Sequence, residues 1–340
     1  MTLSIALDAM GGDHGAPVVV PAALEIIGSI PDVRLILVGD QHKLTEELNK
    51  HGAKVGGRLE IQHASQVVAM DESPALALRS KKDSSMRVAI NQVKEGNAQA
   101  CVSAGNTGAL MATARFVLKM LPGIDRPAIC TALPTMKGHT HMLDLGANID
   151  SSADALYQYA LMGSILSAAI DNIENPTIGL LNIGEEEIKG SEYIKEAARL
   201  ISQSDMNYYG FVEGDDIYKG TVDVVVCDGF VGNVALKASE GIARMVKHFL
   251  KEAFLSGWRG KVAALLAKPA LKLFASRIDP AKYNGASLVG LQGIVIKSHG
   301  GADADSFANA IRVAIKEVDK NVPERIAKEL GAKVEKRQAI

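Results

Sequence analysis

The sequence contains few cysteines and few aromatic residues. Its three cysteines, Cys101, Cys130 and Cys227, are far apart in the 340 residues and form no C-x-x-C pair. This spacing argues against a disulfide framework and against a structural zinc site. Cys101 and Cys227 lie in apolar, strand-like runs, where an inert core thiol is favoured over a reactive one. A reducing cytoplasm fits this cysteine usage best.

An excess of charge of one sign is also absent. The 37 basic and 39 acidic side chains give a formal net charge of −2. A protein whose whole surface follows a nucleic acid backbone usually needs a basic domain, so we expect no nucleic acid partner. With 47% hydrophobic and 22% charged residues, the composition is that of an ordinary globular protein.

Long uninterrupted hydrophobic runs are missing too. The longest apolar stretch, residues 153–170, contains Asp154, Tyr157, Gln158 and Tyr159. We interpret it as a buried core helix or subunit-interface helix rather than a membrane span. The N-terminal sequence MTLSIALDAMGG predicts a strand and has no basic segment followed by a long apolar run, so we expect no signal peptide.

The sequence does show a regular alternation of strand-like and helical patterns. Its strand-like runs include SIALDAM, RLILVGD, ACVSAG, TIGLLNIG and VDVVVCDG. Several are apolar throughout, which is typical of strands covered by helices on both faces of a mostly parallel sheet. We therefore predict a doubly wound α/β sandwich. Residues 1–340 are expected to form a single bilobal domain with a cleft between its lobes.

Residues 230–282 depart from this alternation. The segment has helical patterning without a strand-like run, and it is interrupted by Ser256-Gly257 and by Pro269. We predict that it forms a projecting helical hairpin.

Four predicted strands run directly into glycine-rich or asparagine-bearing loops. These are ALDAMGGDHG, VSAGNTGA, DLGAN, which ends in Asn148, and VVVCDGFVGN. In an open α/β sheet the ligand site lies beyond the carboxyl ends of the strands, where helices that begin there present free N–H groups to anions. We expect several of these loops to bind one phosphate together.

The loop SAGNTG has the composition of an anion-binding nest. Gly105 and Gly108 allow tight turns, and Ser103, Asn106 and Thr107 supply hydrogen-bond donors before an apolar helix. The alternative is that Asn106 or Thr107 simply caps that helix. The spacing matches neither G-x-G-x-x-G nor G-x-x-x-x-G-K-[ST], which weakens a dinucleotide or P-loop interpretation.

Three further side chains follow predicted strands. Lys189 in LLNIGEEEIKG could supply a fixed positive charge to the ligand site, although most lysines are solvated surface residues. Asn233, near a predicted helix start, could donate to a developing oxyanion or cap that helix. His299 in KSHGG could bind phosphate or carry a proton.

Four aspartates also lie in these loops. They could cap helices and brace loops, or they could orient Lys189 and substrate amides. Because a carboxylate repels a phosphate dianion unless it is paired, we expect supporting roles for them, with divalent-metal ligation as a minor alternative. We expect that neither a bound metal nor a cofactor is required. These residues are Asp8, Asp13, Asp144 and Asp228.

Six long motifs follow one another from Ile5 to about Arg312. They are DAMGGDHG, SAGNTGALM, LDLGAN, LLNIGEEEIKGSE, DVVVCDGFVGNVALK, and YNGASLVGL with VIKSHG. Together they resemble the PlsX family, the acyl-carrier-protein phosphate acyltransferases of bacterial phospholipid synthesis. The resemblance implies a homodimer with a three-layer α/β/α fold, similar to phosphotransacetylase and to the isocitrate and isopropylmalate dehydrogenases.

The resemblance also implies a reaction. A long-chain fatty acyl group passes from acyl-carrier protein to inorganic phosphate, and the acyl phosphate goes on to a membrane glycerol-3-phosphate acyltransferase. Lys189 and Asn233 are the catalytic pair that it implies. Since no activated serine or cysteine is apparent, we expect phosphate held at residues 103–108 to attack the thioester directly, with Lys189 offsetting charge and Asn233 stabilising the oxyanion.

Two other classes of function stay open. One is a metal-dependent decarboxylating dehydrogenase on a related scaffold, although the sequence has no evident nucleotide fingerprint. The other is a non-catalytic membrane adaptor that uses only the hairpin.

The predicted hairpin combines basic and apolar side chains. Residues 244–282 contain nine basic residues against Glu252 and Asp279. We predict a peripheral anchor on anionic lipid, which places the protein in the cytoplasm at the inner face of the cell membrane. A dimer-packing hairpin and a dock for the acidic carrier protein are the alternatives. The predicted membrane-contact residues are Phe254, Leu255, Trp258, Val262, Leu265 and Leu266.

Overall fold

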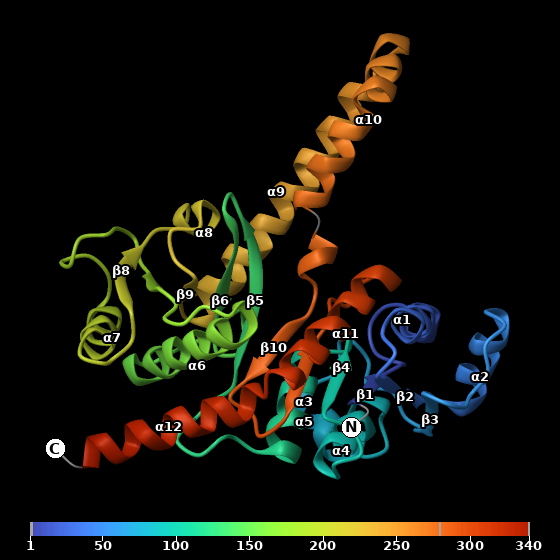
Figure 1. Cartoon of the computed structure of the whole chain (residues 1–340), viewed down its shortest axis with the longest axis horizontal. Helices are drawn as coiled ribbons and strands as arrows, with labels where there is room; N and C mark the ends of the chain where they lie inside the picture. The colour runs from blue at the N-terminus through green and yellow to red at the C-terminus, as the bar shows by residue number, and fades with distance from the viewer. Residues whose placement is uncertain (1–2, 279, 339–340) are drawn as a thin grey trace.

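The computed structural model describes the backbone of residues 3–278 and 280–338 and the side chains of residues 3–274 and 282–330. Strands and helices alternate along most of the chain (Figure 1). The first part comprises β1 (Leu3–Asp8), α1 (Ala16–Ser29), β2 (Val33–Gly39), α2 (Gln41–Lys50), β3 (Leu59–His63), α3 (Pro74–Ser80), α4 (Ser85–Lys94), β4 (Ala100–Ser103), α5 (Thr107–Leu118) and β5 (Ala128–Thr135). The second part comprises β6 (Gly138–Leu143), α6 (Ala153–Asp171), β7 (Ile178–Leu181), α7 (Glu192–Ser202), β8 (Tyr208–Val212), α8 (Asp216–Lys219), β9 (Val224–Val226), α9 (Gly229–Leu255), α10 (Trp258–Ile278), the 3₁₀ helix η1 (Pro280–Tyr283), β10 (Ala286–Val289), β11 (Ile294–Lys297), α11 (Ala304–Asp319) and α12 (Val322–Gln338).

The strands of the described residues form one sheet of 11, in the order β3-β2-β1-β4-β11-β10-β5-β6-β9-β7-β8. The first five strands in this order are parallel to one another. Strand β10 is antiparallel to both of its neighbours, and β5 and β6 form an antiparallel hairpin. The last four strands are again parallel, but they run opposite to the first five. The predicted α/β fold with a mostly parallel sheet is confirmed.

Helices cover both faces of this sheet, because successive side chains of a strand point to opposite faces. Ile5 and Leu7 of β1 enter a core that includes residues of α1 and α11, whereas Ala6 enters a core with residues of α4 and α5. On β6, Leu143 enters a core with α6, and Met142 enters a different core, against which residues of α9 pack. This arrangement is the predicted three-layer α/β/α sandwich.

Helix α6 contains the longest apolar stretch of the sequence. Its residues Tyr159, Leu161 and Met162 are buried in the core, which confirms the interpretation as a buried helix. Among the residues that the structure describes, no helix has both the length and the apolar character that crossing a membrane would require.

Helices α9 and α10 form the predicted hairpin. They pack against each other and project from the rest of the molecule (Figure 1). The turn falls at Ser256-Gly257, as predicted, but Pro269 lies inside α10 rather than interrupting it. The side chain of Arg277, one of the nine basic residues of the predicted hairpin surface, and the whole of the acidic Asp279 lie outside the described residues.

Candidate active site

A first group of loops follows β1, β4 and β11. Asp8 and Ser103 form its buried base. They end the adjacent parallel strands β1 and β4, and both are fully buried. Ser103 Oγ donates to Asp8 Oδ2 over 2.6 Å, and Gly105 N donates to Ser103 Oγ over 3.1 Å. Burial raises the pKa of Asp8, and the Ser103 hydrogen bond opposes this shift. Asp8 thus braces the loop of residues 103–108 from below.

Asn106 caps helix α5 and ties its loop to a neighbouring one. Its Oδ1 accepts from Ala109 N over 2.9 Å, and its Nδ2 donates to the carbonyl oxygens of Met70 and Glu72. The capping interpretation of Asn106 therefore describes its side chain, whereas Thr107 is exposed at the first position of the helix. An anion at this loop would be bound mainly by backbone N–H groups.

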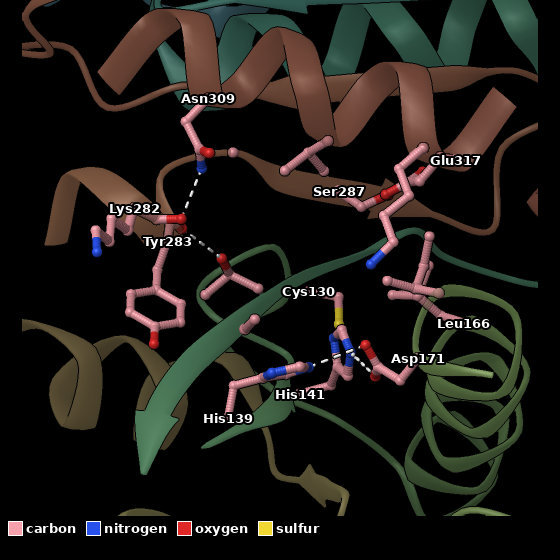
Figure 2. A pocket seen from close by; sticks show the side chains of 16 residues that line it. Cys130, His139, His141, Leu166, Asp171, Lys282, Tyr283, Ser287, Asn309 and Glu317 are labelled. Atoms are coloured by element: carbon pink, nitrogen blue, oxygen red, sulfur yellow. Dashed lines mark hydrogen bonds and ion pairs between the residues drawn. The ribbon is translucent and has the colours of Figure 1, made fainter. Parts of the chain in front are cut away.

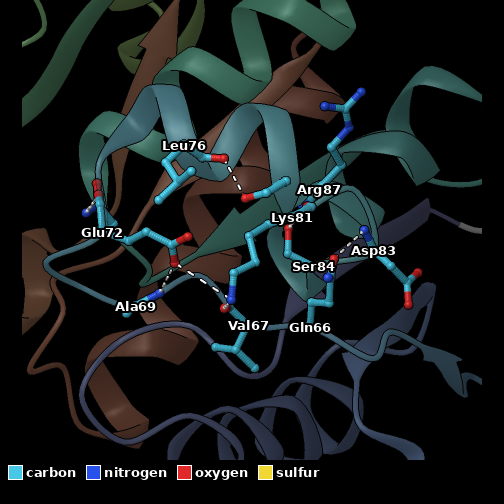
Figure 3. A network of polar contacts seen from close by, with 11 residues as sticks. Gln66, Val67, Ala69, Glu72, Leu76, Lys81, Asp83, Ser84 and Arg87 are labelled. Atoms are coloured by element: carbon cyan, nitrogen blue, oxygen red, sulfur yellow. Dashed lines mark hydrogen bonds and ion pairs between the residues drawn. The ribbon is translucent and has the colours of Figure 1, made fainter.

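The neighbouring loop, between β3 and α3, is held by its own polar contacts (Figure 3). The Glu72 carboxylate accepts from Ala69 N over 3.2 Å and lies 3.9 Å from Lys81 Nζ. Lys81 Nζ also donates to Val67 O over 3.1 Å. These contacts hold in place the loop whose carbonyl oxygens accept from Asn106.

Two lysines, Lys297 of β11 and Lys237 of α9, place positive charge beside the first loop group. Lys297, the last residue of β11, donates from Nζ to Ala104 O over 3.2 Å, and burial lowers the pKa of Lys297 to about 8. The charge of Lys237 on α9 contributes further to this lowering, and it also lowers the pKa of His299, after the larger effect of burial. Lys237 and Lys297 were not predicted from the sequence, although Lys297 ends a strand in the motif VIKSHG.

His299 and Asp13 lie on adjoining loops of the same group. His299 Nδ1 accepts from Gly301 N over 3.1 Å, and Asp13 N donates to Gly300 O over 2.9 Å. A neutral imidazole that accepts at Nδ1 carries its proton on Nε2. The exposed His299 ring can therefore donate a hydrogen bond to an anion.

A second group of loops follows β6, β7 and β9. Asp144, directly after β6, lies at its centre. Its Oδ1 accepts from Ile129 N over 2.9 Å and from Ala147 N over 3.0 Å, while Oδ2 accepts from Asn148 N over 2.7 Å and from Asn148 Nδ2 over 3.0 Å. Burial raises the pKa of Asp144, and these hydrogen bonds oppose the shift. Asn148 Nδ2 also donates to Pro127 O, so this amide braces the loop rather than facing a ligand.

Helix α9 begins in close contact with the Asp144 loop. Asp228 caps the helix, since its Oδ1 accepts a backbone N–H of the first turn over 2.9 Å. Gly229 N donates to Asn148 O over 2.9 Å. A side-chain carbon on Gly232 would lie only 1.9 Å from Asp144 O. The helix can approach the loop this closely only because glycine has no side chain.

Lys189 and Asn233 both belong to the second group. Lys189 Nζ lies 2.8 Å from Glu186 Oε2, and this hydrogen bond raises the pKa of Lys189. Asn233 is exposed on α9 and packs over the Asp144 loop at Gly146. No hydrogen bond joins Lys189 to Asn233 in the described part of the chain.

A hydrogen bond connects α7, which follows the Lys189 loop, to the residue that caps α9. Tyr193 OH, at the start of α7, donates to Asp228 Oδ2 over 3.2 Å. The loop between β7 and α7, which contains Lys189, therefore ends beside the start of α9.

The strands that carry the two loop groups run in opposite directions, since β1, β4 and β11 run opposite to β6, β7 and β9. The carboxyl ends of β11 and β6 nevertheless lie at nearly the same level of the sheet, because Ile296 is in register with Leu143 through β10 and β5. The expectation that several of these loops bind one phosphate together stays a prediction. Helix α9 links the groups. Asn233 and Lys237 are four residues apart, so they lie about one turn apart on one face of the helix. That face leads from the Asp144 loop toward Lys297 and His299.

The three cysteines are buried in the core. Burial raises the pKa of each thiol well above its usual value. A thiol becomes a strong nucleophile only as the thiolate, so none of them is suited to form an acyl-enzyme.

Comparison with solved structures defines the class of the fold. The chain is similar to phosphotransacetylases from Streptococcus pyogenes (TM-score 0.63, 17% identity, 94% of each chain covered) and Staphylococcus aureus (TM-score 0.61, 16% identity, 93% and 94% covered). A 4-hydroxythreonine-4-phosphate dehydrogenase from Klebsiella pneumoniae is also similar, with a TM-score of 0.53 and 13% identity over 94% of this chain and 100% of that one. The protein therefore has the α/β fold shared by phosphotransacetylases and certain dehydrogenases.

Sequence comparison then gives the family. A family model described as a fatty acid synthesis protein matches residues 3–325. The phosphate acyltransferases of Nitrosococcus oceani and Methylococcus capsulatus are 64% and 62% identical to this chain, over 97% and 96% of both sequences. The chain belongs to this phosphate acyltransferase family, and it is an acyltransferase of lipid biosynthesis. Neither the decarboxylating dehydrogenase nor the non-catalytic adaptor is supported.

The contact between α9 and the Asp144 loop generates a first prediction. Gly232→Ala should destabilise the fold by about 2 kcal/mol or more, because the new methyl group would overlap backbone atoms. Gly241, on the same helix, has no neighbouring atom within 4 Å of an added side-chain carbon. Gly241→Ala should therefore stabilise the protein by about 0.5–1 kcal/mol, the usual advantage of alanine in a helix. Chemical denaturation of both variants measures this, and equal effects would refute the close contact.

Proposed function

We propose that this enzyme transfers a long-chain fatty acyl group from the thioester of acyl-carrier protein to inorganic phosphate. The acyl phosphate would then serve phosphatidic acid synthesis through a membrane glycerol-3-phosphate acyltransferase. Family membership supports acyl transfer to phosphate. The structural observation that carries the proposal is the face of α9 on which Asn233 and Lys237 lie about one turn apart between two polar loop groups.

Phosphate is proposed to bind at the first loop group. Backbone N–H groups of residues 103–108 and the α5 N-terminus suit an anion, and the carboxylate of Asp8 is turned to Ser103 beneath them. Lys297 and Lys237 offset the charge of the dianion, and His299 Nε2 can donate to it. Asp13 and Asp8 keep the supporting roles expected of them.

The reaction is proposed as a direct attack. A phosphate oxygen forms a bond to the thioester carbon, the C–S bond breaks, and the proton of hydrogen phosphate ends on the carrier thiol. The Asn233 amide donates to the oxyanion of the tetrahedral intermediate, while Lys189 supplies positive charge from the neighbouring loop. Catalysis then comes mainly from holding two substrates in position.

One assay tests the proposed reaction. Purified enzyme is incubated with acyl-carrier protein bearing a long acyl chain and with radiolabelled phosphate, and labelled acyl phosphate is separated from free phosphate by extraction into organic solvent. The proposal predicts labelled acyl phosphate and an equal amount of free carrier thiol. Release of free fatty acid without labelled acyl phosphate would contradict it.

Lys189→Ala should abolish turnover and leave the melting temperature unchanged, because the exposed ammonium contributes charge and makes no core contact. The control is Lys195→Ala, which removes a similar surface pair, 3.1 Å from Glu192 on α7. Steady-state kinetics and thermal denaturation compare the two variants. Normal kcat in Lys189→Ala would remove Lys189 from the mechanism.

Asn233→Ala should lower kcat by about a hundredfold or more, the scale observed when one oxyanion donor is lost. Asn233→Asp keeps the shape but has no N–H donor, so it should lose a similar factor. Since Asp228 caps α9, neither change should lower stability by the amount typical of a lost cap. A stability loss with unchanged kcat would mean that Asn233 is only structural.

The hairpin is proposed to hold the enzyme peripherally on the inner face of the cell membrane. Around its turn, Trp258, Leu265 and Leu266 are each more than 70% exposed, and Arg259 lies over the Trp258 ring. Leu255 and Val262 are also exposed, while Phe254 is partly buried. Apolar tips with basic neighbours bind anionic lipid interfaces.

A homodimer is part of the same proposal. Three apolar side chains nearer the base of the hairpin, Ile242, Met245 and Phe249, are exposed on α9. They offer a surface on which a second copy could pack, apart from the tip proposed for the membrane.

Trp258→Glu combined with Leu265→Glu should release the enzyme from anionic liposomes and preserve both the dimer and the activity on soluble acyl-carrier protein. A matched control changes two exposed apolar residues elsewhere, Val55→Glu and Tyr209→Glu, and should leave liposome binding unchanged. Co-sedimentation measures binding. The anchor proposal fails if the hairpin variant still sediments with liposomes, or if it loses carrier-dependent turnover instead.

A further inference from the structure

Two histidines and one aspartate meet in a cavity that the acyl transfer site does not use. The cavity has a volume of about 160 Å³ and lies among residues of β5, β6, β10, α6 and α11 (Figure 2). His139 and His141 line it from β6, and Asp171 lines it from the end of α6. One nitrogen of each ring and one carboxylate oxygen all lie within 4.8 Å of one another.

The fold brings these side chains together in a simple way. His139 and His141 are two residues apart on a strand, so their rings point to the same face of the sheet. Asp171 is the last residue of the helix that covers this face. His139 Nε2 lies 3.0 Å from Asp171 Oδ1, and His141 Nε2 lies 2.7 Å from Asp171 Oδ2 (Figure 2).

The cluster is only partly shielded from solvent, because the His139 side chain is 38% exposed. His141 is 5% exposed, and its Nδ1 has no hydrogen-bond partner among the described residues. Burial by itself would raise the pKa of Asp171, but the hydrogen bonds to both histidines outweigh it and hold this pKa below its usual range. Each oxygen of the Asp171 carboxylate lies beside a histidine nitrogen.

We propose that His139, His141 and Asp171 bind a divalent transition-metal ion, with Zn²⁺ as the best match. Zn²⁺ accepts imidazole nitrogen and carboxylate oxygen at about 2.0–2.2 Å. Ligands at that distance lie roughly 3–3.5 Å apart around a tetrahedral ion. The separations of 3.0 and 2.7 Å involve different oxygens of Asp171, and the three ligand atoms with one oxygen lie within 4.8 Å of one another. The side chains would therefore draw together around the ion. The ion would replace the proton that each histidine shares with the carboxylate.

The cavity leaves room for a water molecule at the fourth coordination position of the ion. Its volume exceeds what a water molecule needs, and Ser287 and Glu317 form its opposite wall (Figure 2). Burial raises the pKa of Glu317 to about 8, against the effect of its hydrogen bond from Ser287. A metal-bound water can therefore be accommodated beside polar groups.

The position of the proposed ion indicates a structural role rather than a catalytic one. His141 and Leu143 share one face of β6, and Leu143 packs with α6. Met142 points to the other face, against which residues of α9 pack. The ion would fasten the β5–β6 hairpin to α6, on the face away from Asn233. Its loss should therefore change stability more than turnover.

Metal binding by the full-length protein tests this inference. The protein is stripped with a chelator, dialysed, and titrated with Zn²⁺ by calorimetry, with bound zinc counted by elemental analysis. One Zn²⁺ per chain and a higher melting temperature with the ion are expected. His139→Gln and Asp171→Asn should each weaken binding at least about tenfold, since even the indirect supports of metal ligands contribute that much.

Two controls keep the result interpretable. His51, also beside a carboxylate, lies 3.6 Å from Glu47 on the surface, so His51→Gln should bind zinc like the unchanged protein. His139 has the more exposed of the two rings, and its variant decides the matter if Asp171→Asn does not fold. The proposal is overturned if no saturable site is found, which would make the cluster a hydrogen-bonded brace only. It is equally overturned if one zinc per chain still binds to His139→Gln with unchanged affinity.

Discussion

The close packing of α9 on the Asp144 loop positions Asn233 and Lys237, two of the residues that we assign to acyl transfer. Gly232 leaves no space for a side chain above Asp144 O, and Asp228 fixes the first turn of the helix. The loop itself is held by four hydrogen bonds to one buried carboxylate. Asn233 is the next residue after Gly232, so this contact fixes its position directly. Lys237 lies about one turn further along the same helix.

The same constraint explains how carboxylates and an anion can share one region. Asp8 and Asp144 are both buried, and each accepts a hydrogen bond from the loop that it supports. The positive charges of Lys237 and Lys297 lie instead beside the loop proposed to bind phosphate. This separation suits a reaction in which a dianion must approach a carbonyl carbon without a covalent enzyme intermediate.

Sequence patterns predicted the sandwich, the hairpin and the glycine-rich loops because these depend on local periodicity and turn residues. They did not predict that the loops form two groups. Strand direction depends on the insertion of β10 and on the β5–β6 hairpin, and an apolar run looks the same in either direction. The loop sequences also do not show that the Asn106 and Asn148 amides donate hydrogen bonds within the protein, because these are tertiary contacts. The histidine cluster was missed because Asp171 is 30 residues from His141 and only the fold unites them.

Isotope exchange can test, without any mutation, whether phosphate attacks the thioester of acyl-carrier protein directly. The enzyme is incubated with acyl-carrier protein and isotopically labelled free carrier in the absence of phosphate. An acyl-enzyme would pass the acyl group to the labelled carrier. Direct attack predicts no exchange until phosphate is added, because without phosphate no group attacks the thioester. Exchange at the rate of normal turnover without phosphate would contradict it.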